Sequence, residues 1–358
     1  MKIGIVGLPN AGKSTLFNAL TQAAAETGAY PFTTIEPNVA VVPVRDERLE
    51  RVAETVDASE VVFETIAFHD IAGLVRGASE GEGLGNRFLA AIRETDAICH
   101  VVRCHGAAEV VHPEGRVDPL ADIDLVEAEL LAADLEQAEG RLERVAKQAR
   151  AGAREAVAER EWLEAVVAAL AAGRPAREVP APAEAPEAPR LLSALTSKPV
   201  LYVANVDEGV DEVPAPVAER ARATGARAVA ISARVEAELR ELGDPEEAAA
   251  LRAELGIGEA GLERVVRAAF ELLDLITFFT ADRGSPAMAR TLRRGGTAWD
   301  AAGRVHTDIQ AGFVRAEVIP WRDLVEAGGY AQARERGLIR IEGRDYAVAD
   351  GDVITIRH

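Results

Sequence analysis

The chain has 358 residues, of which 48% are hydrophobic, and its formal net charge is −19. This composition is sufficient for a large buried core and excludes a disordered or fibrous chain. The negative charge excludes general coating of nucleic acids, because affinity for phosphate backbones comes mostly from Lys and Arg. From Asp282 onward the net charge is +1, which leaves contact with an RNA-rich particle open to the C-terminal part.

No apolar stretch approaches the roughly 20 residues that span a bilayer, and no basic segment with an apolar leader begins the chain. We therefore expect a soluble cytoplasmic protein that has no membrane partner and no sequence-specific DNA partner.

The first motif follows the apolar run at residues 3–6. Residues 7–14, GLPNAGKS, match the phosphate-binding pattern GxxxxGK[ST], which predicts a buried strand, a phosphate-binding loop and a helix over residues 15–24. Lys13 is expected to reach the β- and γ-phosphate oxygens during catalysis, and Ser14 to hold Mg²⁺. The nucleotide contacts predicted here are Asn10, Ala11, Gly12, Lys13, Ser14 and Thr15.

Two further segments carry groups suited to sensing a γ-phosphate. Residues 30–38, YPFTTIEPN, precede a strand expected at 39–43, and Thr34 is predicted to complete the Mg²⁺ shell. The strand expected at 61–68 leads into HDIAGL, where Asp70 would hold an Mg²⁺-bound water and the Gly73 NH would meet the γ-phosphate. A turn with exposed threonines is the alternative for residues 30–38, and a plain solvent loop is the alternative for the glycine-rich residues that follow Leu74.

Leu74 occupies the position where many small GTPases carry a glutamine that orients the attacking water. Leucine cannot do this, so we expect either slow hydrolysis until a partner acts or water positioned by other groups. His112 is our candidate for a catalytic role, and a surface-loop histidine is the alternative. Four glycines between residues 77 and 85 predict a segment that changes conformation before a helix beginning near Leu84.

Residues 98–105, ICHVVRCH, contain both cysteines of the chain and two histidines. A metal site is one interpretation, but the spacing is not CxxC, and the alternation favours a buried strand at 97–103 with free thiols.

A long Ala-rich region follows, with apolar residues stepping by four and three as in an a/d seam, namely Leu131, Leu135, Ala138, Leu142 and Val145. A second helix is predicted over 154–171, and together they would form an antiparallel hairpin. Residues 173–189 read as a linker. Both a partner-binding arm and a purely structural insertion stay open.

The base-recognition region begins with a strand predicted at 200–204, followed by NVDE with Asn205, Val206 and Glu208. GTPases carry NKxD here, and the longer Glu208 would misplace the acceptor that binds guanine. Adenine does not need this acceptor, and Asn205 could address its Hoogsteen edge. A shifted register that uses Asp207 is the alternative. After a strand expected at 228–231, Ser232 and Ala233 form the last predicted base contact.

These ordered motifs resemble the YchF/Obg-like ATPase family of translation-factor-related P-loop proteins over nearly the whole chain. The resemblance implies an α/β fold: a P-loop NTPase domain of the OBG type at 1–123 and 196–274, a helical coiled-coil insertion at 124–195, and a β-grasp TGS domain at 275–358. It also implies Mg²⁺-dependent hydrolysis of ATP in preference to GTP and association with the ribosome or its large subunit. Asn10 matches the loop asparagine with which relatives coordinate K⁺.

Three other functions are compatible with parts of the sequence. An Obg-type GTPase is disfavoured by Glu208. A phosphotransferase would share the phosphate loop, but the sequence offers two switch-like loops in place of an evident lid or acceptor pocket. A ribosome-binding module with nearly vestigial ATP hydrolysis would bind irrespective of the nucleotide.

Overall fold

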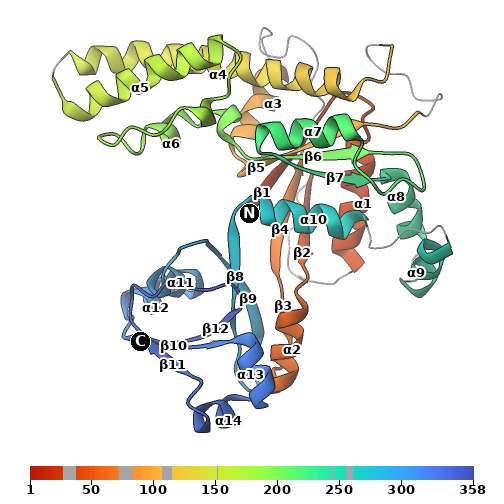
Figure 1. Ribbon diagram of the computed structural model, residues 1–358, viewed down its shortest axis with the longest axis vertical. Helices are drawn as coiled ribbons and strands as arrows, with labels where there is room; N and C mark the ends of the chain where they lie inside the picture. Colours follow the sequence, from red (N-terminus) through yellow and green to blue (C-terminus); the bar gives the residue numbers. More distant parts are fainter. Residues whose placement is uncertain (27–37, 72–83, 107–114, 151, 243–244, 255–260) are drawn as a thin grey trace. The chain divides into compact units, whose positions relative to one another are not determined.

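The computed structural model describes residues 1–26, 38–71, 84–106, 115–150, 152–242, 245–254 and 261–358 (Figure 1). Their contacts form two compact units, the first chiefly Met1–Ala23 and Ala67–Ala269, the second chiefly Val41–Ile66 and Phe270–His358. The contacts therefore group residues 41–66 with the C-terminal part, and the three-part division expected from the sequence stays a prediction.

The first sheet has six strands in the order β2 (Val39–Val44), β4 (Glu64–Asp70), β1 (Lys2–Val6), β5 (Ala97–Arg103), β6 (Val200–Asn205) and β7 (Arg227–Ile231). From β4 to β7 the neighbouring strands are parallel. All seven residues of β5 are buried, as expected for the near-continuous apolar strands of a parallel sheet. The loops after these strands consequently meet at one edge of the sheet.

Several helices accompany this sheet in the first unit, namely α1 (Lys13–Glu26), α3 (Leu84–Arg93), α7 (Ala215–Thr224), α8 (Ala233–Glu241), α9 (Pro245–Glu254) and α10 (Gly261–Leu272). The predicted strand at 97–103 and the helices following residues 14 and 84 are confirmed. The strand predicted at 61–68 is wrong in one respect. It is divided into β3 (Val61–Val62), which pairs with β9 (Ala287–Arg293) of the other sheet, and β4, which pairs with β1.

A helical hairpin extends from the first unit and consists of α4 (Pro119–Ala149) and α5 (Arg154–Ala171), which lie side by side (Figure 1). Asp118 caps α4 by accepting a hydrogen bond from the Ala121 NH at 3.1 Å, and Pro119 occupies the first turn. The five seam residues predicted on α4 all contribute to one apolar cluster with α5, so the predicted hairpin is confirmed.

The linker predicted at 173–189 is wrong. This segment forms η1 (Ala176–Glu178) and leads into α6 (Ala188–Leu192), and Ala176, Ala185 and Ala188 are buried in the hairpin cluster. Alanine is small enough to pack against helices without a regular pattern, so the Pro- and Ala-rich composition concealed a folded segment.

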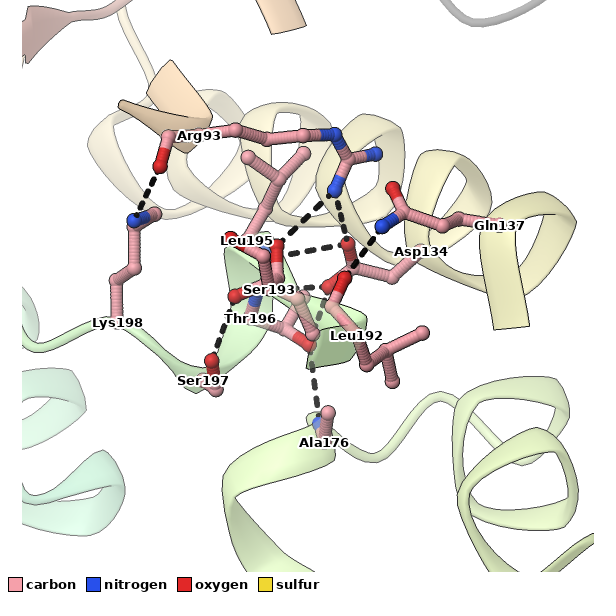
Figure 2. Close-up of polar contacts among 11 residues, drawn as sticks. Arg93, Asp134, Gln137, Ala176, Leu192, Ser193, Leu195, Thr196, Ser197 and Lys198 are labelled. Carbon is pink, nitrogen blue, oxygen red and sulfur yellow. Dashed lines mark hydrogen bonds and ion pairs between the residues drawn. The ribbon is translucent and has the colours of Figure 1, made fainter. Parts of the chain in front are cut away.

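The buried carboxylate of Asp134 fixes the base of this hairpin (Figure 2). It accepts hydrogen bonds from the Leu195 NH at 2.8 Å, and from the Thr196 NH at 2.7 Å and hydroxyl at 2.8 Å, at the start of η2 (Leu195–Ser197). The Arg93 guanidinium on α3 completes the set at 3.4 Å. A desolvated carboxylate is stable here because the surrounding donors satisfy it.

The second unit is built on a mixed sheet in the order β11 (Arg340–Glu342), β10 (Arg315–Pro320), β12 (Asp352–Arg357), β8 (Leu275–Thr280), β9 (Ala287–Arg293) and β3. One face packs on α2 (Glu47–Val56) and α13 (Trp321–Ala327) in a buried cluster that includes Phe279 and Val353. The other face packs Phe278 and Ile354 against α11 (Ala298–Val305). The remaining helices are α12 (Thr307–Ala311) and α14 (Tyr330–Glu335).

Candidate nucleotide-binding site

The phosphate loop connects β1 to α1, and two of its glycines cannot be replaced without strain. Gly7 has φ of 151° and Gly12 has φ of 99°. A Cβ atom at Gly7 would lie 2.4 Å from the backbone oxygen of Val101, and one at Gly12 would lie 2.2 Å from Asn205 Nδ2. The loop therefore lies directly against β5 and β6, an approach that glycine permits.

Lys13 begins α1 and is only 7% exposed. Its Nζ donates a hydrogen bond of 2.7 Å to the Leu8 carbonyl, inside the loop. Burial lowers the pKa of Lys13, and the Asp70 carboxylate at the end of β4 opposes this shift. Burial likewise raises the pKa of Asp70, and Lys13 opposes that shift. The two side chains thus provide a partly desolvated cation and anion at the carboxyl edge of the sheet.

This pair of charges fits a polyphosphate with a divalent cation. A phosphate would receive the Lys13 ammonium and the NH groups at the start of α1, where the helix dipole favours negative charge. Carboxylate and hydroxyl oxygens, which Asp70 and Ser14 provide, are suited to Mg²⁺. The residues present are therefore compatible with both groups.

Asn205 joins the phosphate loop to the turn after β7. Its side chain is 6% exposed, its Nδ2 donates to the Ala11 carbonyl at 3.0 Å, and its Oδ1 accepts from the Ala233 NH at 3.1 Å. The neighbouring Val206 is buried, and its NH donates to the Ile231 carbonyl at 2.9 Å. Asn205 consequently links the phosphate loop to the turn after β7 by side-chain hydrogen bonds. One hydrogen of its amide group is left for the predicted contact with a base.

Glu208 lies beyond this link and is 47% exposed in its side chain. Its Oε2 accepts from Arg234 Nη2 at 3.4 Å, on the first turn of α8. The Asp207 carboxylate accepts from the Gly106 NH at 3.2 Å, and Ala204 is fully buried within β6. This geometry favours the register that begins at Asn205 over the shifted register that uses Asp207.

The other predicted contacts occupy the same edge. Ser14 is exposed on the first turn of α1, Thr15 is half-buried beside it, and Asn10 is exposed with φ of 62°. Ser232 is the residue preceding α8 and is half-buried. The predicted residues Thr34, Gly73 and His112 lie outside the described residues and stay predictions.

His100 on β5 is a buried polar residue near the phosphate loop. The sequence did not indicate this proximity. It is 2% exposed, its ring centroid lies 5.7 Å from that of Tyr202, and its Nε2 has no hydrogen-bond partner among the described residues. Burial, with a smaller contribution from Lys13, lowers the pKa of His100 to about 3. A histidine within an otherwise apolar strand was the available signal for a neutral, buried ring.

The metal site considered for residues 98–105 finds no support in the described part of the chain. It contains no group of three or more His, Cys, Asp or Glu side chains able to hold a metal ion. Cys99 and Cys104 are free thiols, as predicted. The described helices also include none that could span a membrane.

Comparisons with known proteins cover the full chain. Residues 2–135 match a family described as 50S ribosome-binding GTPase, and residues 275–358 match the C-terminal family of YchF GTPases, described as a protein of unknown function. A Bacillus subtilis protein named Ribosome-binding ATPase YchF is 46% identical over 362 residues, covering 99% of this chain and 98% of the relative.

An Escherichia coli O157:H7 protein of the same name is 48% identical over 356 residues, with the same coverage. The solved structure described as the Schizosaccharomyces pombe YchF GTPase is 33% identical, with a TM-score of 0.87, and covers 100% of this chain and 97% of that one. The similarity therefore includes both units and the hairpin.

Proposed function

The chain belongs to the YchF family, and from this premise we propose that it is a ribosome-binding ATPase that acts as a nucleotide switch. The observation that carries the proposal is the phosphate loop, whose glycines lie against β5 and β6 and whose buried lysine faces a carboxylate. The proposal includes a cytoplasmic location.

Each polar residue at the edge of the sheet has a role in this proposal. Lys13 binds the β- and γ-phosphate oxygens, and the loop NH groups orient them. Ser14, Asp70 through a water, and Thr34 would hold Mg²⁺, which would neutralise phosphate charge. The Gly73 NH senses the γ-phosphate, His112 is a candidate for positioning water, and Asn10 is a candidate K⁺ ligand.

Adenine rather than guanine is the proposed base, because a glutamate replaces the aspartate that binds guanine. Glu208 is a methylene longer and pairs with Arg234 at the rim of the site. The Asn205 side chain joins the Ala11 carbonyl to the Ala233 NH, and this link would not depend on which base is bound. Asn205, Val206, Glu208, Ser232 and Ala233 would then line the base side.

The proposed switch is driven by differential contact with the γ-phosphate, which orders Thr34 and the segment after Asp70. The hairpin is proposed to act as a coiled-coil arm, and residues 275–358 as a β-grasp TGS module. These two parts would contact the ribosome, through its large subunit, in a manner that depends on the nucleotide.

The decisive experiment is equilibrium binding of ATP and GTP analogues in the presence of Mg²⁺ to the parent protein and to Glu208→Asp. We expect tighter ATP binding by the parent and a gain of guanine affinity in the variant. Glu238→Asp is the matched control, because Glu238 also pairs with Arg234 but lies a helical turn further along α8. A clear GTP preference in the parent would return the chain to the Obg-type GTPases.

Two further measurements test hydrolysis and the switch. Release of inorganic phosphate without a phosphorylated product separates an ATPase from a phosphotransferase. Co-sedimentation with ribosomes in the presence of ATP, of ADP and of no nucleotide should give different bound fractions. Equal fractions would favour a binding module that ignores the nucleotide.

A further inference from the structure

The end of the helical hairpin carries a net positive charge. Residues 143–155 contain four basic and two acidic side chains in a chain with a net charge of −19. We call the four basic residues the hairpin tip: Arg144, Lys147, Arg150 and Arg154. All four are exposed, and in Figure 1 the turn between α4 and α5 lies at the end of the hairpin away from the strands of the first unit.

Several other arginines of the arm are paired with carboxylates. Arg141 donates to Glu159 at 2.7 Å, Arg160 lies 3.4 Å from Glu164, and Arg190 lies 2.5 Å from Glu187. By contrast, Arg144, Lys147 and Arg150 pair with no carboxylate among the described residues. The charge at the tip is therefore available to a partner.

Stabilisation of the helices does not account for this arrangement. Cations near the C-terminus of α4 are favourable to its dipole, which would explain Lys147 and Arg150. Arg154, however, is the first residue of α5, where the dipole disfavours a cation, and its side chain is 90% exposed. Its nearest carboxylate, on Glu184, is 3.7 Å away and itself 57% exposed.

The helix also has a glycine beside these cations. Gly140 lies inside α4, and a Cβ atom there would meet nothing within 4 Å, so packing does not require glycine. Apart from proline, glycine is the least favourable residue in a helix interior. It lies one turn from Arg144, whose Nε donates to its carbonyl at 3.1 Å. Residues 144 and 147 follow on the same side of the helix.

We propose that the hairpin tip binds the phosphate backbone of RNA. The tip has four exposed cations, of which Arg144, Lys147 and Arg150 pair with no carboxylate among the described residues and Arg154 pairs with the exposed Glu184. Such cations complement the charge of phosphates, and the glycine leaves space for the close approach of a strand. This inference rests on the proposed ribosome function and assigns it a contact surface.

The test uses the full-length protein and the triple variant Arg144→Gln, Lys147→Gln, Arg150→Gln, which preserves helix-forming side chains. The matched control, Arg160→Gln, Arg174→Gln, Arg190→Gln, removes the same charge from paired arginines of the arm. Binding to purified large ribosomal subunits and to a short RNA duplex is measured over a series of KCl concentrations. Circular dichroism confirms the helix content of each variant.

We expect the tip variant to bind the duplex at least about tenfold more weakly than the parent at low salt, with the control unchanged. The slope of log affinity against log salt should fall by about 2 to 3, because each lost phosphate contact removes about 0.7 to 0.9. Equal affinities and slopes for the parent and the tip variant would overturn the inference.

The two probes separate this inference from the proposed function. If the parent and the tip variant bind ribosomal subunits equally, the tip assignment is wrong and ribosome binding stands. If the parent binds the duplex more tightly than the tip variant does, but the parent does not bind subunits, the proposed function is wrong and the tip assignment stands. Loss of subunit binding with no duplex binding by the parent would indicate an acidic protein as the partner and overturn the RNA assignment.

Discussion

The phosphate side and the base side of the nucleotide site are constructed differently. On the phosphate side, Lys13 is 7% exposed and Gly7 has no space for a Cβ atom. On the base side, Glu208 and Arg234 are about half and three-quarters exposed, and Gly209 has open space around it. The phosphate side is thus fixed by packing. On the base side Asn205, Val206 and Ala233 are also buried, and only the outer part, Glu208 with Arg234, is reached by water. Substitutions should have large effects on the phosphate side and small effects on this outer part.

The largest expected effect is on the phosphate side. Lys13→Ala should weaken ATP binding by about 100-fold or more, because the phosphates would lose a buried charged partner, a loss that costs about 3 to 5 kcal/mol. Isothermal titration calorimetry with an ATP analogue measures the change. Lys2→Ala, at an exposed position outside the loop, is the matched control. Normal ATP binding by Lys13→Ala would show that the site has been assigned incorrectly.

A matched pair of glycine substitutions compares the two sides directly. Gly7→Ala should reduce the free energy of unfolding by about 2 to 4 kcal/mol, since it combines strained φ with a backbone clash at 2.4 Å. Gly209→Ala has φ of 76° but no close neighbour, so its cost should be about 1 kcal/mol. Urea denaturation followed by circular dichroism gives both values. Equal costs would contradict the difference in packing between the two sides.

The next effect is a pH dependence from the neutral ring behind the phosphate loop. The pKa of His100 is lowered to about 3 in the folded chain, so between pH 3 and about 6.5 the unfolded chain binds one more proton than the folded chain. Stability is therefore present above pH 6.5 and is lost as the pH falls. From pH 7 to 5 this histidine should cost about 2 kcal/mol.

His100→Phe isolates this contribution, because phenylalanine retains an aromatic ring beside Tyr202 and does not titrate. The free energy of unfolding of each protein is measured at pH 7 and at pH 5. The parent should lose about 2 kcal/mol more than the variant. Parallel losses would mean that His100 does not stay neutral in the folded chain.

The same contrast explains what the sequence could predict. The loop pattern, the fully buried strand at 97–103 and the a/d steps on α4 are local signals, and each predicted its element correctly. The hydrogen bonds by which Asn205 and Asp134 join distant segments could not be predicted, because their partners lie far along the chain in Ala11 and Leu195. Such ties depend on which loops the sheet brings together, and sequence spacing does not encode that.

The grouping of residues 41–66 with the C-terminal unit also depends on distant partners. Helix α2 has an apolar face, formed by Leu49, Val52 and Val56, that would suit any sheet. In the structure this face packs against Phe279 and Val353 of the C-terminal part, and Arg48 beside it lies 2.6 Å from Asp350. These partners lie more than 200 residues along the chain, so the sequence pattern could not indicate them. The predicted domain division therefore placed the helix with its nearest neighbours in sequence.

The smallest expected effect is on the base side and tests whether the ion pair or the length of Glu208 selects the base. Arg234→Ala should change stability by less than about 1 kcal/mol and ATP affinity by less than about threefold, because an exposed pair at 3.4 Å is screened by water and salt. ATP and GTP affinities are measured at low and high KCl. If Arg234→Ala admits GTP as well as Glu208→Asp does, the ion pair holds Glu208 away from guanine, and selection depends on its orientation. If only Glu208→Asp admits GTP, the additional methylene of Glu208 is sufficient to exclude guanine, and Arg234 does not contribute to the selection of the base.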